Sequence, residues 1–234
     1  MIEALLRRVA TRYGLAVVKR GDEPLVYIHD YAGGYDEYRS VQTAANKRKL
    51  SHVWADAVTL GAVAADLGRR FPAGVRSGIC HGARNGFEVA WFREALDADV
   101  IGTDISETAT QFADMVVWDF HDANPDWSGR FDFVYTNSLD QAVAPQRALA
   151  AWAAQLVPAG RIYIEHTASH GVDGAGEMDP FGAHPMVMPY LFFKWGRGTY
   201  ALDDILEVEA KANKKLRAWI FVLRSEPAAQ SGGD

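Results

Sequence analysis

The fold of this chain is decided by Ser77-Gly-Ile-Cys-His-Gly-Ala-Arg-Asn-Gly-Phe-Glu88 and by Asp97-Ala-Asp-Val-Ile-Gly-Thr-Asp-Ile-Ser106 shortly after it. In the first stretch, glycines punctuate a turn at the end of a short apolar run, and residues 87–96 have the spacing of a helix packed on a sheet. In the second, Asp104 ends the next apolar run, 18 residues beyond Gly86. The second strand of a βαβ unit places a carboxylate there to accept hydrogen bonds from ribose hydroxyls. Together the two stretches predict a nucleoside-binding strand, turn and helix.

Length and composition bound the rest of the interpretation. The 234 residues are 49% hydrophobic, which suits one main globular domain with a substantial core. The net charge of −6 and the sequence pI of about 5.6 argue against a nucleic-acid partner. A single cysteine, Cys80, excludes an intramolecular disulfide framework, and the first residues do not resemble a secretory signal. We therefore expect a cytoplasmic protein, and since no run of 18 apolar residues occurs, no membrane association.

The first part of the chain is mostly helical in pattern. We predict helices over 2–13, 35–49 and 51–70, with an apolar, glycine-bounded loop or hairpin between the first two. These form a helical N-terminal cap region, residues 1–72. At the other end, residues 225–234 are rich in Pro, Ala, Ser and Gly, and we predict a disordered tail there.

From residue 75 onward the sequence pattern changes to short apolar runs separated by helical or polar segments, which is typical of an α/β sheet. The runs predict five parallel strands, over 75–80, 99–103, 115–118, 131–136 and 161–165, with a helix over 145–156. Two further strand-like runs, 205–210 and 216–223, are separated by a turn too short for a crossover, so they must pair antiparallel. The predicted fold class is α/β, a doubly wound, mostly parallel seven-stranded sheet with a C-terminal antiparallel hairpin.

At residues 75–223 the chain resembles the class I S-adenosylmethionine-dependent methyltransferases, whose seven-stranded sheet also ends in an antiparallel strand. The family's first motif has an acid, one residue, then three glycines at alternate positions. Here Gly82 and Gly86 keep the first and third glycines, Cys80 stands in place of the acid, and Arg84 replaces the middle glycine. A neutral thiol cannot offer the charge-assisted hydrogen bond of a carboxylate, which leaves open how the donor's methionine amino group is held. The resemblance makes S-adenosylmethionine the expected cofactor.

The family's later motifs also match. Asp104 stands at the position of the ribose acid, with Ile105 beside it, and Asp119 at that of the acid that binds the adenine amine. Phe120 or Trp118 would stack on the adenine. The fourth motif, residues 135–140, brings Asn137 toward the methionine part, and Leu156-Val-Pro-Ala-Gly160 matches the loop before the fifth strand. The resemblance assigns donor binding to Cys80, His81, Gly82, Arg84, Gly86, Asp104, Ile105, Asp119, Phe120 and Asn137.

Several of these residues have an ordinary structural alternative. Asp104 could cap the helix that begins near Glu107, although Ser106 is a better cap. Asp119 could form a turn before the Asx-rich stretch 122–125. His81 could face the ligand or bind backbone groups within a tight loop. Cys80 is better suited to be a small buried residue than a nucleophile, since no base is paired with it.

Methyl transfer from a sulfonium is an in-line displacement, so the enzyme must mainly align the acceptor and exclude water. Hydroxyl and ammonium acceptors must also lose a proton, and His166 and His170, just after the fifth strand, lie where a ligand-facing loop is expected. Asp140 and Glu165 are alternative bases. These four side chains could in principle hold a metal, as in catechol-type methyltransferases, but their spacing fits no short ligand motif, so we expect no metal. The predicted catalytic residues are His166, His170 and Asp140.

The segment 167–200 interleaves aromatic residues and methionines with glycines and prolines, which suits either an adaptable pocket wall or a hydrophobic core element. We treat it as a substrate-lid insertion within an S-adenosylmethionine-binding domain spanning 73–224. The resemblance implies a cleft between 31–49 and 167–200 and a small-molecule acceptor, with transfer to its oxygen or nitrogen. We expect no nucleic-acid or membrane partner, and allow for a homodimer.

Two alternative functions stay open. Tyr190 and Lys194 have the Tyr-x-x-x-Lys spacing of NAD(P)-dependent short-chain oxidoreductases, although in those proteins the glycine turn normally opens the chain, whereas here it follows 77 residues. The incomplete first motif also fits a non-catalytic, methyltransferase-like partner protein.

Overall fold

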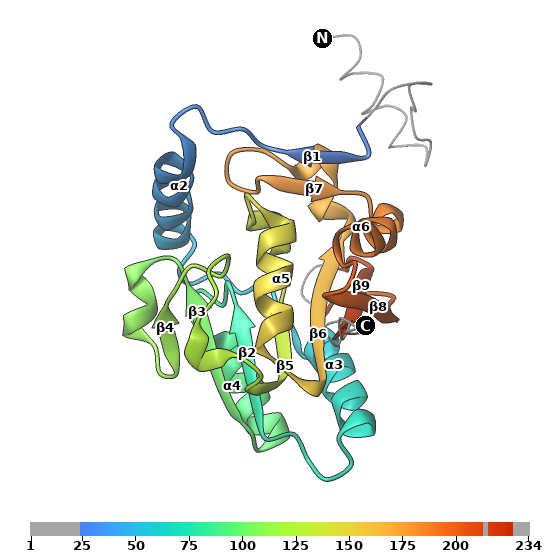
Figure 1. The fold of residues 1–234 in the computed structure, drawn as a ribbon. Coiled ribbons are helices and arrows are strands. Elements are labelled where there is room, and N and C mark those ends of the chain that lie inside the picture. The colour runs from blue at the N-terminus through green and yellow to red at the C-terminus, as the bar shows by residue number, and fades with distance from the viewer. Residues whose placement is uncertain (1–23, 213–214, 227–234) are drawn as a thin grey trace, which may run out of the picture.

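The computed structural model describes residues 24–212 and 215–226. Its centre is a seven-stranded sheet in the order β4-β3-β2-β5-β6-β9-β8 (Figure 1). The strands are β2 (Ser77–His81), β3 (Asp99–Asp104), β4 (Met115–Val117), β5 (Phe131–Thr136), β6 (Leu156–Thr167), β8 (Tyr200–Val208) and β9 (Ala218–Ser225). The first five are parallel to one another, whereas β9 runs antiparallel to both β6 and β8. The predicted fold class, with its terminal hairpin, is confirmed.

Helices cover both faces of this sheet. They are α3 (Ala57–Arg70), α4 (Phe87–Leu96), α5 (Pro145–Gln155) and α6 (Met188–Trp195), whereas α2 (Gly34–Arg48) lies beyond the carboxyl ends of the parallel strands (Figure 1). In the described residues, six short 3₁₀ helices lie in the connections: η1 (Glu107–Gln111), η2 (Pro125–Trp127), η3 (Leu139–Gln141), η4 (Ala168–His170), η5 (Val172–Gly174) and η6 (Pro185–Val187). Successive residues of a strand point to opposite faces, so Ile79 packs with Trp152 of α5 while Cys80 packs with Phe92 of α4. Two apolar clusters therefore sandwich the sheet.

The predicted helices that fall on described residues are found, and one of them begins later than expected. The helix expected over 51–70 begins only at Ala57, because Asp56 is its cap: Oδ1 accepts hydrogen bonds from the backbone N–H groups of Val58 and Thr59, at 3.0 and 3.1 Å. This helix, assigned above to the N-terminal cap region, packs against α4, β8 and β9 on one face of the sheet. The helix predicted over 2–13 lies outside the described residues.

The first residue of the predicted disordered tail, 225–234, belongs to strand β9. Ser225 is the last residue of that strand, and the backbone N–H of Glu226 donates to the carbonyl of Thr199 at 2.8 Å. The rest of the expected tail lies outside the described residues. Within the part of the chain that the structure describes, no helix is both long and apolar enough to cross a membrane.

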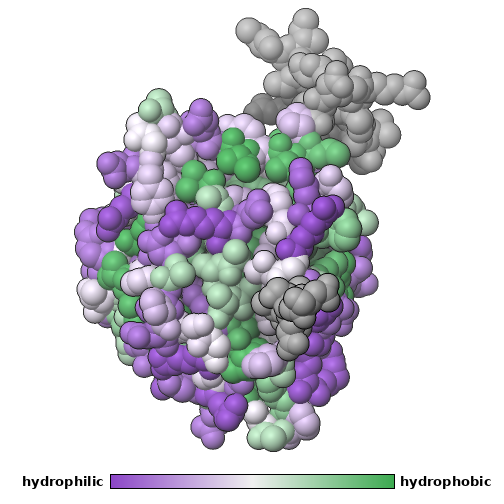
Figure 2. All heavy atoms as spheres, viewed as in Figure 1, coloured by the Kyte–Doolittle hydropathy of each residue, from purple (hydrophilic) through white to green (hydrophobic). Residues whose placement is uncertain are grey.

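A second, two-stranded sheet ties the N-terminal region to the insertion before β8. Strand β1 (Val26–Ile28) pairs antiparallel with β7 (Phe181–Ala183). In Figure 1 this pair and α2 stand beyond the carboxyl ends of the parallel strands. Leu25 and Ile28 are exposed beside it, and Figure 2 shows apolar residues gathered over this end of the molecule. The region expected to be a loop or hairpin thus brings residues 24–49 alongside residues 167–200.

Candidate functional site

The turn after β2 has the backbone that its glycines predict. Gly82 and Gly86 have φ angles of +69° and +71°, and Gly86 directly precedes α4. A Cβ on Gly82 would lie 2.6 Å from the Cβ of Ser138, so only glycine fits against the loop after β5. Arg84, at the position of the missing middle glycine, also has a left-handed backbone, with φ +44°. The chain path of the glycine turn is therefore kept without its middle glycine.

Asp104 fastens this turn to the end of β3. Its Oδ2 accepts a hydrogen bond from the backbone N–H of Arg84 at 3.1 Å, and its Oδ1 accepts one from Ser106 at 2.9 Å. The cap of η1 is Ser106, whose hydroxyl accepts from Thr108, so Asp104 does not cap the helix. Burial raises the pKa of Asp104, and the two backbone N–H groups oppose that rise by favouring the carboxylate.

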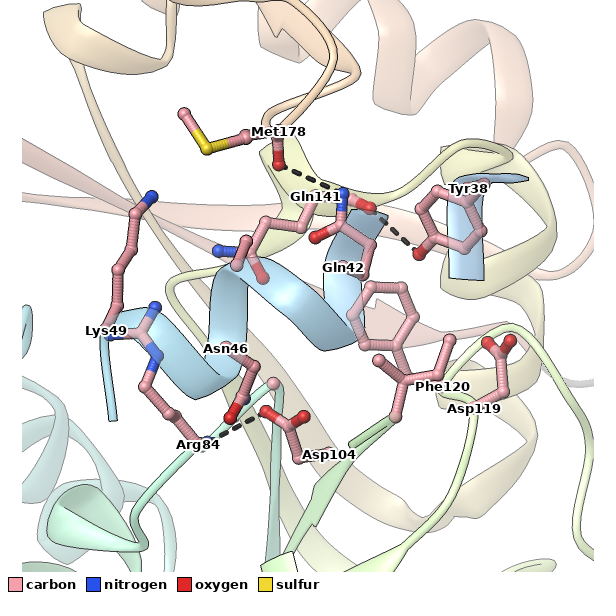
Figure 3. A pocket seen from close by; sticks show the side chains of 13 residues that line it. Tyr38, Gln42, Asn46, Lys49, Arg84, Asp104, Asp119, Phe120, Gln141 and Met178 are labelled. Atoms are coloured by element: carbon pink, nitrogen blue, oxygen red, sulfur yellow. Dashed lines mark hydrogen bonds between the residues drawn. The ribbon is translucent and has the colours of Figure 1, made fainter. Parts of the chain in front are cut away.

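Asp104 lines a narrow cavity whose volume is about 30 Å³. The floor is formed by residues that follow three parallel strands: Gly82 after β2, Asp104 and Ile105 at the end of β3, and Asp119 and Phe120 after β4. The opposite wall is α2, with Tyr38, Gln42 and Asn46. In Figure 3, Asn46 points from α2 toward Asp104, and Gln42 points toward Met178. Six residues predicted to bind the donor therefore line this one cavity: the five named above and Arg84.

Asp119 lines this cavity and has one carboxylate oxygen without a hydrogen-bond partner. Its Oδ1 accepts a hydrogen bond from the backbone N–H of His121 at 2.9 Å and lies 2.7 Å from Nδ1 of the same residue. This is the turn-forming role considered above. Its Oδ2, however, is buried and has no hydrogen-bond partner. A buried carboxylate oxygen without a donor is costly, so this atom can gain from a hydrogen-bond donor brought close to it.

The cavity is narrow because α2 closes over it. The hydroxyl of Tyr38 donates to the carbonyl of Gln141 at 3.0 Å, and the Gln42 amide donates to the carbonyl of Met178 at 3.0 Å. The Tyr31 hydroxyl donates to the carbonyl of Glu177 nearby. Segments 31–49 and 167–200, predicted to border a cleft, thus meet across this site.

A second, larger cavity of about 520 Å³ adjoins the first and shares Lys49, Gly82, Arg84 and Gln141 with it. Its lining combines opposite charges with an aromatic ring: Arg84 and Lys49 on one hand, Glu88, Asp140 and Asp179 on the other, and the indole of Trp54. Asn137 and Ser138 contribute from the loop after β5. Such a lining suits a polar or zwitterionic small molecule rather than an apolar one.

Asp140 and His170 face each other in this second cavity. Asp140 Oδ1 is buried and has no hydrogen-bond partner, and its Oδ2 lies 3.8 Å from Nε2 of His170. Burial, and then the charge of Asp179, raises the pKa of Asp140 to about 8. The backbone N–H of Thr167 donates to Nδ1 of His170 at 3.3 Å, so in the neutral ring the hydrogen-bond network assigns the proton to Nε2. Burial lowers the pKa of His170 to about 4, and the ring faces the cavity as a neutral donor.

No family model matches the chain, and no curated protein matches it in sequence. Solved structures do match. A Burkholderia thailandensis 1,6-didemethyltoxoflavin N1-methyltransferase, bound to 1,6-didemethyltoxoflavin and S-adenosylhomocysteine, superposes with a TM-score of 0.62 at 18% identity, over 91% of this chain and 95% of that one. The N-methyltransferase NodS from Bradyrhizobium japonicum WM9, in complex with S-adenosylhomocysteine, gives 0.55 at 11% identity, over 80% and 98%. The cyclase SpnF gives 0.54 at 12% identity, over 71% and 80%.

The chain has the class I S-adenosylmethionine-dependent methyltransferase fold. At these identities the likeness establishes the fold, and SpnF is named for a different reaction. Within the methyltransferase fold, both cavities lie beyond the carboxyl ends of the parallel strands, where open α/β sheets bind ligands.

Three predicted donor-binding residues lie in neither cavity. Cys80 is fully buried among the residues between the sheet and helices α3 and α4. His81 points to the other face, where Nδ1 lies 2.8 Å from the Thr103 hydroxyl, Nε2 lies 2.9 Å from Oε1 of Gln155, and the ring stacks on Trp152. Of the two predicted locations for His81, the structure gives neither: it is a core side chain. Gly86 shapes the turn but stands on the outer side of α4.

Two further candidates are turned away from the second cavity. His166 is buried with Nε2 3.0 Å from the carbonyl oxygen of Ala183, while Glu165 accepts from the Tyr135 hydroxyl at 2.9 Å and pairs with the ammonium of Lys211. Only Asp140 and His170 of the predicted acid–base groups line the cavity. Among the described residues, no group of three or more His, Cys, Asp or Glu is placed to hold a metal ion.

The two residues on which the oxidoreductase alternative depends lie outside both cavities. Tyr190 is 60% exposed on α6, Lys194 is exposed on the same helix, and neither lines either of the two cavities described above. Trp118 is also absent from the first cavity, because its indole N–H donates to the carbonyl of Asp122 and its ring packs on Trp127. Phe120 is therefore the aromatic residue at the end of β4 that faces the site.

Sequence reasoning missed several residues of the site. Gln42 lines the first cavity, and Glu88, Trp54 and Asp179 line the second. The available signal was strongest for Glu88, an acid in the first turn of the helix that directly follows the glycine turn. Trp54 and Asp179 lie in irregular segments without a motif, so only the fold brings them to the site.

Proposed function

We propose that the protein is an S-adenosylmethionine-dependent methyltransferase that transfers a methyl group to an oxygen or nitrogen of a small-molecule acceptor. One observation carries the proposal: Asp119, whose buried Oδ2 has no hydrogen-bond partner, lines the same cavity as Asp104, and the two residues lie at the ends of neighbouring strands β4 and β3. An adenosine group offers donors to both carboxylates, an exocyclic amine for Asp119 and ribose hydroxyls for Asp104.

The residues present fit that group. Each Asp104 oxygen accepts one backbone hydrogen bond and keeps a second lone pair for a ribose hydroxyl. Phe120 and Ile105 give apolar contact for an adenine ring, and Gly82 and Arg84 lead from this cavity to the larger one, where Asn137 lies. Two similar structures, the didemethyltoxoflavin methyltransferase and NodS, hold S-adenosylhomocysteine, which supports the same class of ligand here.

S-Adenosylmethionine, when bound, supplies a methyl group activated on a sulfonium. The chain then has to hold the acceptor in line and keep water out. Helix α2 and the segment around Met178 serve the second task, since their contacts cover the first cavity. A cavity of about 30 Å³ cannot admit an adenosine, so binding requires α2 to move away from Met178 and Gln141.

We assign to the acceptor the part of the second cavity that Asp140 and His170 line. Asp140 is the proposed base, because its unpartnered Oδ1 can take a proton from a hydroxyl or ammonium group once the carboxyl is ionised. His170 is proposed to orient the acceptor by donating from Nε2, since Nδ1 is already used by the backbone of Thr167. His166 is less suited to either role because the carbonyl oxygen of Ala183 occupies its Nε2.

Calorimetric titration with S-adenosylmethionine, S-adenosylhomocysteine and NADP tests the proposal. We expect the two sulfur nucleosides to bind and NADP not to bind. Asp119→Ala should weaken nucleoside binding, whereas Asp126→Ala, at an exposed carboxylate nearby, should leave it unchanged. Binding of NADP alone would overturn the proposal, and donor binding with no methyl transfer to any of a broad acceptor panel would favour a non-catalytic protein or a different reaction.

A further inference from the structure

The end of β2 carries no charge toward the ligand cavities. Cys80, where the methyltransferase fold commonly has an acid, is fully buried and packs against α4. Burial raises the pKa of its thiol, so the group is neutral. An amino-acid ammonium that is taken out of water needs an anionic partner, and strand β2 cannot supply one.

A carboxylate reaches the neighbouring space from a different element. Glu88 lies in the first turn of α4, two residues after Gly86, and is only 6% exposed. It lines the second cavity together with Gly82, Ala83 and Asn137. Its charge is one of the causes that raise the pKa of the Cys80 thiol, so the carboxylate lies close to the strand position that lacks an acid.

The fold itself does not explain a buried acid at this point. Burial raises the pKa of Glu88 to about 7, and the carboxylates of Glu165 and Asp104 add to the rise. Its own backbone amide and the Arg84 guanidinium oppose it without restoring an ordinary value. An ionised Glu88 is therefore under-compensated in the protein alone and would be stabilised by a cation delivered into the cavity.

We infer that Glu88 binds the α-ammonium group of the donor's methionine part, taking over the role of the absent strand-end acid. The inference rests on the proposed function. It also fits the charges of the junction between the two cavities, where Arg84 and Lys49 line both. An amino-acid group carries one cation and one anion; the second cavity offers Glu88 for the first, and Arg84 or Lys49, which line both cavities, for the second.

The test separates the amino-acid part of the ligand from the adenosine part. S-Adenosylhomocysteine and 5′-methylthioadenosine share the adenosine and thioether, but only the former has the amino-acid group. In calorimetry, Glu88→Gln should weaken binding of S-adenosylhomocysteine by about 10- to 100-fold, consistent with loss of one charge-assisted hydrogen bond. It should leave the affinity for 5′-methylthioadenosine within about 2-fold, as expected for a residue that touches only the amino-acid part. Glu94→Gln, at an exposed acid on the same helix, should change neither.

Two further measurements keep the inference testable if Glu88→Gln does not fold. Glu88→Asp keeps the carboxylate and should bind S-adenosylhomocysteine more tightly than Glu88→Gln does. The wild-type protein should bind an S-adenosylhomocysteine analogue without the amino group about 10- to 100-fold more weakly than the parent compound. Equal binding of these two ligands, or equal losses for both nucleosides in Glu88→Gln, would overturn the inference. Failure of the wild type to bind any of the nucleosides would instead overturn the proposed function.

Discussion

Asp119→Asn is the sharpest test of the donor site, because it changes one atom that the structure leaves unpartnered. Oδ1 of Asp119 is held by His121, so an amide in the same orientation keeps that contact and places an NH₂ group where the free Oδ2 now lies. The adenine amine would then meet a donor instead of an acceptor. Loss of a hydrogen bond to a charged acceptor costs about 1.5–3 kcal/mol. At about 1.4 kcal/mol per factor of ten, S-adenosylhomocysteine should bind about 10- to 150-fold more weakly.

A ligand swap shows whether the loss comes from that contact. S-Inosylhomocysteine carries a carbonyl oxygen in place of the adenine amine, so it should bind the wild type weakly and regain affinity in Asp119→Asn. Calorimetry of both ligands with both proteins forms a double-mutant cycle, and unfolding midpoints check that the variant is folded. Unchanged affinity of Asp119→Asn for S-adenosylhomocysteine, or equal losses for both ligands, would refute the placement of adenine against this atom.

Five other outcomes follow from the same geometry. Asp104→Ala should weaken S-adenosylmethionine binding several-fold to hundreds-fold in the same calorimetric assay, since it removes the acceptor for the ribose hydroxyls, about 1.5–3 kcal/mol; unchanged affinity would contradict that role. Asp140→Asn should lower turnover by about 100-fold or more with donor affinity kept, as expected on loss of a general base. Wild-type turnover should rise with pH through about 8, the pKa of that carboxyl, and a rate that is flat from pH 6 to 9 would count against it. Glu88 has a folded-state pKa near 7, above its ordinary 4.5, so the folded state keeps a proton that the unfolded chain loses and wild-type stability falls between those pH values. Glu88→Gln should therefore gain about 3 kcal/mol relative to wild type between pH 4.5 and 8 in urea unfolding, whereas a constant difference would argue against the shifted pKa. Lys211→Met leaves the buried Glu165 carboxylate without its cation and should cost about 3–5 kcal/mol of unfolding free energy, and Lys211→Met with Glu165→Gln should cost less.

The main sheet could be predicted from local sequence because all its strands except β4 have five residues or more and so show their pattern. Residues 131–136 and 87–96 were bounded as the structure has them, and the short link between the last two strands forced an antiparallel pair. The β1–β7 pair was missed for the opposite reason. Each of its strands has only three residues, and their partners lie more than 150 residues apart, so no local pattern distinguishes them from loop. Such pairing is decided by tertiary contacts.

The candidate site was predictable where a motif marks the end of a strand. Asp104, Asp119 and Asn137 follow β3, β4 and β5, and the fold brings all three to the cavities. His81 was beyond such reasoning because side chains alternate across a strand: its neighbour Cys80 faces α4, so the imidazole faces Trp152 of α5. Glu88 was missed because a search by motif position looks for the acid on the strand and not on the helix after it.

Arg84 explains how the turn tolerates two departures from the usual motif at once. A left-handed backbone costs a residue with a Cβ about 1–2 kcal/mol relative to glycine. Here the Arg84 N–H donates to Asp104, and its guanidinium donates to the carbonyl of His52 at 3.1 Å, so both ends of the residue gain hydrogen bonds that offset this cost. A glycine at this position would leave the junction of the two cavities without this cation. Arg84 and Glu88 place opposite charges on the lining of the second cavity, and in the proposed site these charges complement the anion and the cation of a zwitterionic ligand.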